Sequence, residues 1–338
     1  MSNKNLLSGR DKELQELAEQ YEAAMAGNKP FYQDADELAD LADWYGTKKR
    51  YDKAFEIAEY GLKLHPDSTE LMIEYAYLHL DNGKKAKARE IIENLPDTYS
   101  PEAKVVRAHL LLSEGKLDDA EQLLDTIEDK DDLANVVDVS YMYLDMGYPD
   151  KALAWLDPVK EEYSNEEAYI AVVADCLYGK GMTEEAIPLY NRLIDMNPYS
   201  APYWFGLARC HFEEMNFNQA IDACDYALVS DDEFADAYVM KGHCFYQLGN
   251  EDAALEYYQK AEELHGLAPE FIYTYIGLCK VSKGEWKEGY ENLEKAILEN
   301  ETDEVASPIL PAYMPMQGFA ISKMGKKRKA HQYCKKAT

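Results

Sequence analysis

Positive charge and long apolar runs are scarce in this sequence of 338 residues. Lysine and arginine total 35 against 64 aspartate and glutamate residues, which gives a formal net charge of −29 at pH 7. Such an acidic surface repels phosphate backbones and anionic lipids, so we expect neither a nucleic-acid nor a membrane partner. The sequence has no apolar run of about eighteen residues and no N-terminal signal-peptide pattern, so we predict a cytoplasmic protein.

Sequence motifs for catalysis and metal binding are also absent. There is no Gly-rich phosphate loop, no His-Glu-x-x-His, no Gly-x-Ser-x-Gly and no Cys-x-x-Cys. His243 and Cys244 are adjacent on a predicted helix and point about 100° apart, a poor geometry for sharing one metal ion. We therefore predict a protein that is not an enzyme, with no catalytic residue, no cofactor and no metal site.

The six cysteines do not form the pattern of a disulfide framework. Cys176, Cys210, Cys244 and Cys279 are separated by 34, 34 and 35 residues. Equivalent positions in stacked helical units lie roughly 8–10 Å apart, which is too far for a disulfide bond. We predict small, buried, reduced thiols at these positions.

The sequence does contain a regular register of small residues. Alanines recur at intervals of 34, 32, 32, 34, 34 and 34 residues, and they are Ala54, Ala88, Ala120, Ala152, Ala186, Ala220 and Ala254. A glycine stands five residues before five of these alanines, namely Gly83, Gly115, Gly147, Gly181 and Gly249, and Gly284 and Gly325 stand at the same distance before the later small residues Gly289 and Ala330. Such a period indicates one structural unit repeated along an axis, with each copy burying its apolar face against its neighbours.

Each unit has the pattern of a helical hairpin. In the unit after Pro198, Trp204, Leu207, Ala208 and His211 fall at i, i+3, i+4 and i+7, which predicts an amphipathic helix. A second apolar stripe begins at Phe217 after a short polar break. The recurring glycine suits a left-handed residue that closes the first helix, and we expect prolines such as Pro66 and Pro198 to end second helices.

At these residues the chain resembles the tetratricopeptide repeat family. The unit that begins at Ala235 carries the family pattern at Tyr238, Gly242, Phe245, Gly249, Ala254, Tyr258 and Ala261. The resemblance implies an all-α fold, a right-handed superhelical solenoid of helix-turn-helix repeats. We predict an N-terminal capping helix in residues 1–30, eight hairpins in 31–299, an inserted acidic loop with prolines at 300–311, and a ninth hairpin in 312–338.

The resemblance also implies where a ligand would bind. In this family the first helices line a concave face, and ligands meet side chains at the second, fifth, ninth and twelfth helix positions. Carried onto this chain, those positions suggest a peptide-binding groove formed by Tyr77, His109, Tyr141, Asp175, Tyr178, Phe205, Arg209, Phe212, His243 and Tyr246. The predicted function is a non-enzymatic adaptor that holds a peptide segment of another protein.

Two alternative functions remain open from the sequence. One is an intracellular sensor of peptide signals, as in some relatives with this repeat. The other is an assembly subunit, a homo-oligomer included, that docks through the C-terminal end, because the sequence stops near a second helix without a polar-faced capping helix. The Lys–Asn clamp that some family members use for chaperone tails is not matched, since its positions hold pairs such as Ala39 and Asp43.

Overall fold

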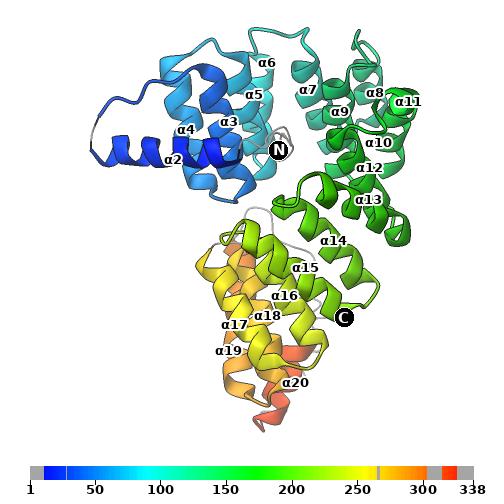
Figure 1. The fold of residues 1–338 in the computed structure, drawn as a ribbon. Helices are drawn as coiled ribbons and strands as arrows, with labels where there is room; N and C mark the ends of the chain where they lie inside the picture. The colour runs from blue at the N-terminus through cyan, green and yellow to red at the C-terminus, as the bar shows by residue number, and fades with distance from the viewer. Residues whose placement is uncertain (1–10, 28, 265–266, 303–313, 326–338) are drawn as a thin grey trace. The chain divides into compact units, whose positions relative to one another are not determined.

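The computed structural model describes residues 11–27, 29–264, 267–302 and 314–325, and every regular element in these residues is helical (Figure 1). This agrees with the all-α solenoid predicted from the repeat. The chain divides into two compact units, Met1–Ser200 and Ala201–Thr338. The two units are described separately below.

The first unit contains α2 and then a series of helical hairpins. Helix α2 spans Asp11–Ala26, and the hairpins are α3 (Ala35–Thr47) with α4 (Tyr51–Leu64), α5 (Thr69–Asp81) with α6 (Lys85–Glu93), α7 (Pro101–Ser113) with α8 (Leu117–Leu124), α9 (Leu133–Asp145) with α10 (Pro149–Leu156), and α12 (Glu167–Gly179) with α13 (Thr183–Met196). The first helix of each hairpin packs on the first helix of the next one. Side chains from successive first helices are therefore brought to one face of the unit.

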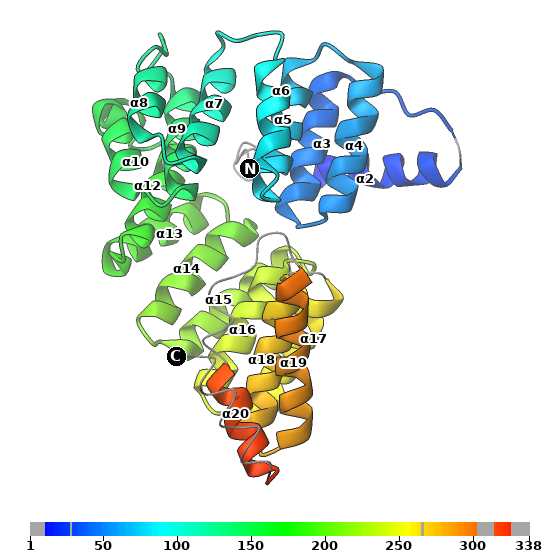
Figure 2. The same ribbon diagram turned by 180° about the vertical axis from the view of Figure 1, so that it is seen from behind.

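The second unit continues the pattern. Its helices are α14 (Ala201–Glu213) with α15 (Phe217–Ser230), α16 (Ala235–Gln247) with α17 (Glu251–Glu263), α18 (Pro269–Ser282) with α19 (Trp286–Thr302), and α20 (Met314–Lys323) (Figure 2). Helix α20 packs on α18 and α19, where Ala320 and Ile321 are buried with Val281 and Leu293. Most of the predicted 300–311 insertion and the second helix of the ninth hairpin lie outside the described residues.

The turns inside the hairpins confirm the role predicted for the recurring glycine. All seven of these glycines have positive φ angles, from 70° at Gly83 to 83° at Gly325. In the two hairpins without a glycine at this place, Lys49 and Met215 take the same left-handed conformation, with φ of 59° and 58°. The hairpin geometry therefore persists where the favourable residue is absent, at a cost in backbone strain.

Prolines lie close to the ends of several second helices. Helices α4 and α13 end at Leu64 and Met196, two residues before Pro66 and Pro198, as predicted. The second helix of the fourth hairpin is interrupted near Pro158, where α10 gives way to the 3-10 turn η1 (Asp157–Val159) and the short α11 (Lys160–Tyr163). Proline favours this break because it lacks the backbone N–H of a regular helix.

The residues in register lie inside the helix stack. All seven alanines of the register are fully buried, which explains why only a small side chain recurs there. Cys176, Cys210, Cys244 and Cys279 are also buried and are free thiols, as predicted. Burial raises the pKa of the Cys176, Cys244 and Cys279 thiols to about 12, so they stay protonated.

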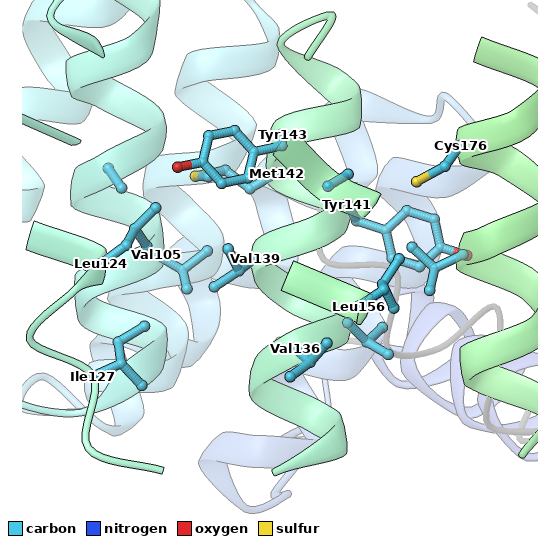
Figure 3. Packing of buried hydrophobic residues seen from close by; sticks show 14 of the residues in the cluster. Val105, Leu124, Ile127, Val136, Val139, Tyr141, Met142, Tyr143, Leu156 and Cys176 are labelled. Atoms are coloured by element: carbon cyan, nitrogen blue, oxygen red, sulfur yellow. The ribbon is translucent and has the colours of Figure 1, made fainter. Parts of the chain in front are cut away.

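The core of the first unit joins neighbouring hairpins. Figure 3 shows one such cluster, in which side chains of α7, α8, α9, α10 and α12 pack together, with Tyr141 and Tyr143 among them. At the N-terminal side, Leu14, Ala18 and Tyr21 of α2 are buried against the first hairpin. No helix in the described residues is long and apolar enough to cross a membrane.

Candidate functional site

The first helices of the first unit enclose a cavity of about 320 Å³, which we call the acidic cavity. Its lining residues come from α3, α5, α7, α9 and the turn before α7, and they are Asp36, Ala39, Asp40, Asp43, Thr69, Glu70, Ile73, Glu74, Tyr77, Asp97, Ser100, Glu102, Val105, His109, Asp138, Tyr141, Met142 and Asp145. Nine of these eighteen side chains are carboxylic acids. The cavity size is at the lower end of the range of ligand-binding pockets.

The acids of this cavity recur at equivalent helix positions. The second position holds Asp36, Glu70 and Glu102, and the sixth holds Asp40, Glu74 and Asp138. The ninth position supplies Asp43, Tyr77, His109 and Tyr141. Helix positions two, six and nine share one face, so stacking the helices gathers these side chains. The predicted groove residues include Tyr77, His109 and Tyr141 of the ninth position but none of the acids at positions two and six.

Glu74 is the most unusual of these acids. Its side chain is only 5% exposed, and its Oε1 atom has no hydrogen-bond partner in the described part of the chain. Burial, followed by the negative charge of Asp43, raises the pKa of the Glu74 carboxyl well above its ordinary value. Asp43 is itself only 3% exposed. The cavity thus contains a carboxyl group whose hydrogen bonding is incomplete within the described residues.

Aromatic groups form the neutral part of the cavity wall. The rings of Tyr77 and His109 lie 5.7 Å apart between centroids. Burial raises the pKa of Tyr77 well above its usual value and lowers the pKa of His109 to about 4, so both are neutral at pH 7. The Tyr141 hydroxyl donates to Asp175 Oδ2 at 3.3 Å, and the Tyr190 hydroxyl donates to Asp175 Oδ1 at 2.7 Å.

The second unit has a different pocket, of about 510 Å³, which we call the aromatic pocket. Its described lining contains no carboxylate and consists of Phe212, His243, Tyr246, Gln247, Tyr258, Tyr275, Leu278 and Met316. The ring of Tyr258 stacks on that of Tyr275, with centroids 5.3 Å apart. A Cβ atom on Gly242 would lie 2.5 Å from Tyr258 Cε1, so the glycine leaves the space that the tyrosine ring occupies.

His243 joins the rings of the aromatic pocket. Its Nδ1 is hydrogen-bonded to the Tyr258 hydroxyl at 2.8 Å, and its ring meets Tyr275 edge-on at 4.5 Å between centroids. Enclosure by these groups lowers the pKa of His243 to about 4, so the imidazole is neutral. This pocket therefore suits an apolar or aromatic group rather than a charged one.

The structure distributes the ten predicted groove residues over both units. Tyr77, His109 and Tyr141 line the acidic cavity, whereas Phe212, His243 and Tyr246 line the aromatic pocket. The other four line neither site: Asp175 accepts the two tyrosine hydroxyls, Tyr178 is half-buried on α12, and Arg209 Cζ lies 5.6 Å from the centroid of the Phe205 ring. The ten predicted groove residues therefore do not line a single cavity in the described part of the structure.

Neither site has the arrangement of a metal centre. Among the described residues, no three His, Cys, Asp or Glu side chains converge in a way that could hold a metal ion. The carboxylates of the acidic cavity are instead spread along four helices and the turn before α7. This arrangement suits an extended ligand with separate contacts better than a single ion.

Two family profiles match separate stretches of the sequence. A tetratricopeptide repeat profile matches residues 47–100, and the profile of anaphase-promoting complex, cyclosome, subunit 3 matches residues 179–261. The chain is a tetratricopeptide-repeat protein. Repeats of this family are in general non-enzymatic scaffolds for protein–protein interaction, and this tetratricopeptide-repeat protein has the same architecture.

A protein that carries the same repeat is similar to this chain in sequence. Over 142 residues the chain is 28% identical to the TPR repeat-containing protein YpiA of Bacillus subtilis (strain 168), a match that covers 40% of this chain and 33% of YpiA. The tetratricopeptide-repeat protein thus matches about a third of the length of that relative.

Solved structures share the fold. A tetratricopeptide repeat protein from Parabacteroides merdae ATCC 43184 aligns with a TM-score of 0.51 at 18% identity, covering 72% of this chain and 98% of that one. The human IFIT1 dimer with PPP-AAAA aligns with a TM-score of 0.56 at 13% identity, covering 90% of each chain. At these identities the likeness concerns the fold alone.

Proposed function

We propose that this tetratricopeptide-repeat protein is a non-enzymatic adaptor that holds a peptide segment of a partner protein against its first helices. The observation that supports the proposal is the acidic cavity, because four successive first helices contribute side chains to one recess. A recess of this kind offers several contacts along an extended chain. The tyrosines of the cavity, Tyr77 and Tyr141, are of the type that contributes most to binding at protein interfaces.

The partner segment is expected to lie along the stack rather than to insert at one point. The lining extends from Asp36 on α3 to Asp145 on α9. Recognition of that kind distributes the binding free energy over several hairpins, with about 1–2 kcal/mol from each well-packed aromatic contact. A single substitution should therefore weaken binding without abolishing it, unless it blocks the recess.

The test is a peptide-display selection against the purified full chain, with counter-selection on a variant whose cavity is filled. Ala39→Leu places a larger apolar side chain on the cavity wall and removes no polar group. Ala86→Leu is the matched control, because Ala86 is exposed on the second helix α6. Peptides that bind the parent and the control but not Ala39→Leu would support the proposal.

Two results would contradict the adaptor function. One is that no peptide is enriched on protein with a normal helical circular-dichroism spectrum. The other is that the recovered peptides bind Ala39→Leu and Ala86→Leu equally.

The alternative assembly surface at the C-terminal end falls largely on residues 326–338, which lie outside the described residues.

A further inference from the structure

We propose that the acidic cavity recognises an arginine side chain of the partner segment, with Glu74 as the buried counter-ion of its guanidinium group. This inference rests on the proposed function, since it specifies the chemistry of the segment that the first helices hold. It concerns the first unit only.

The charge of the cavity selects a cation. Half of the lining side chains are carboxylic acids, and no lysine or arginine is found among the described residues that line the recess. Acids enter from all four first helices, so a ligand along the stack meets carboxylate groups throughout. An anionic segment would be repelled by these carboxylates. A purely apolar segment would bury them without a hydrogen-bond or charge partner.

Glu74 supplies the second and more specific observation. The fold buries this side chain to 5% exposure at the cavity wall, yet gives its Oε1 atom no donor in the described residues. Buried polar atoms are nearly always hydrogen-bonded, so an acceptor without a partner at a cavity wall is suited to a donor that a ligand brings. A guanidinium would provide the donor and, because it is always charged, would favour the ionised carboxylate.

The geometry favours arginine over a compact cation. The acids are distributed over several helices, and no three of the described ones could hold a metal ion. Guanidinium presents several N–H donors in a planar fork, so it can contact separated acceptors, and its flat face packs on aromatic rings. Tyr77 and His109 supply such rings beside Glu74, which lies one helical turn before Tyr77 on α5.

The experiment uses four peptide pools with randomised flanks and one fixed central residue: arginine, lysine, citrulline or glutamine. Citrulline has the shape of arginine without its charge, so it is the matched control on the ligand side. Binding of each pool to the immobilised full chain is measured for the parent, Glu74→Gln and Glu90→Gln. Glu90 is an exposed acid on α6 outside the cavity, so its substitution removes the same charge without changing the recess.

We expect the arginine pool to bind the parent roughly tenfold or more above the citrulline pool, with lysine in between. Glu74→Gln should reduce that preference about tenfold, whereas Glu90→Gln should leave it within about twofold. Asp43→Asn serves as a second cavity variant if Glu74→Gln does not fold, and a reduced arginine preference is again expected.

Three results would overturn the inference, and they differ in what they leave standing. Equal loss for Glu74→Gln and Glu90→Gln would indicate diffuse attraction to an acidic surface. Equal binding of all four pools would leave the adaptor function intact but remove its arginine specificity. Binding of no pool to folded protein would contradict both the inference and the adaptor function.

Discussion

The acidic cavity and the aromatic pocket are built from the same helical hairpin but have opposite linings. His109 and His243 both stand at the ninth position of a first helix, and burial lowers the pKa of each to about 4. Around His109 the neighbouring helices contribute acids, whereas around His243 they contribute tyrosines. The repeat therefore fixes where a side chain projects, and the residues at a few equivalent positions decide the chemistry of the site.

The comparison also separates a pocket whose polar groups pair with one another from the cavity that we propose as the binding site. In the aromatic pocket the rings satisfy one another, because Tyr258 is hydrogen-bonded to His243 and stacked on Tyr275. In the acidic cavity Glu74 has an unsatisfied atom in the described structure. We expect substitutions in the pocket to cost mainly stability, and substitutions in the cavity to alter mainly binding and pH dependence.

The largest expected effect is the loss of Tyr258. Tyr258→Ala removes a fully buried ring that fills the space beside Gly242, so it should lower the free energy of unfolding by about 3–5 kcal/mol. Tyr258→Phe keeps the ring and loses only the bond to His243, at about 1 kcal/mol. Urea unfolding followed by circular dichroism measures both. Equal costs for the two variants would show that the hydroxyl, not the ring, supports the pocket.

A smaller effect is expected at Glu74, and it depends on pH. Because the folded protein raises the pKa of Glu74 above its ordinary value of 4.5, the folded state binds more protons than the unfolded chain, and stability falls as pH rises through this range. Glu74→Gln removes that penalty. Its stability should exceed that of the parent by about 1–3 kcal/mol at pH 8 and by little at pH 4.

Thermal melts of the parent, Glu74→Gln and Glu90→Gln at the two pH values measure this difference. Glu90 is an exposed acid, so its variant should follow the parent. A gap between Glu74→Gln and the parent that does not change between pH 4 and pH 8 would mean that Glu74 titrates normally in the folded protein.

The smallest effect concerns two turns, one in each unit. Lys49 and Met215 hold the left-handed conformation that glycine takes in the other hairpins. Lys49→Gly and Met215→Gly should each stabilise the protein by about 0.5–1 kcal/mol, which is the strain relieved less the entropy lost by glycine. The reverse change, Gly249→Ala, should destabilise by about 1 kcal/mol. Destabilisation by Met215→Gly would show that its side-chain contacts outweigh the backbone strain.

Features that depend on one residue at a fixed spacing could be predicted from the sequence. The left-handed glycines, the buried alanines and the free thiols all follow from the period, because each position repeats the same local geometry. The ninth-position residues Tyr77, His109 and Tyr141 of the predicted groove all line the acidic cavity. Their role in binding stays a prediction.

Features that depend on which side chains of different helices contact one another could not be predicted in the same way. With 64 acids in the chain, Glu74 and Asp138 had no distinguishing signal until their sixth position on stacked helices was known. Tyr258 belongs to a second helix, and only the small Gly242 lets it reach the pocket wall. The break near Pro158 likewise reflects a local exception to the repeat.

The buried cysteines can serve as natural probes of local unfolding. Cys176 belongs to the last hairpin of the first unit, whereas Cys210, Cys244 and Cys279 lie in successive hairpins of the second. Each is fully enclosed, so a thiol reagent can reach it only when its hairpin separates from the stack. Rates of alkylation, assigned to each cysteine by mass spectrometry, would therefore rank the hairpins by how often they unfold locally, without the need to introduce a cysteine by substitution.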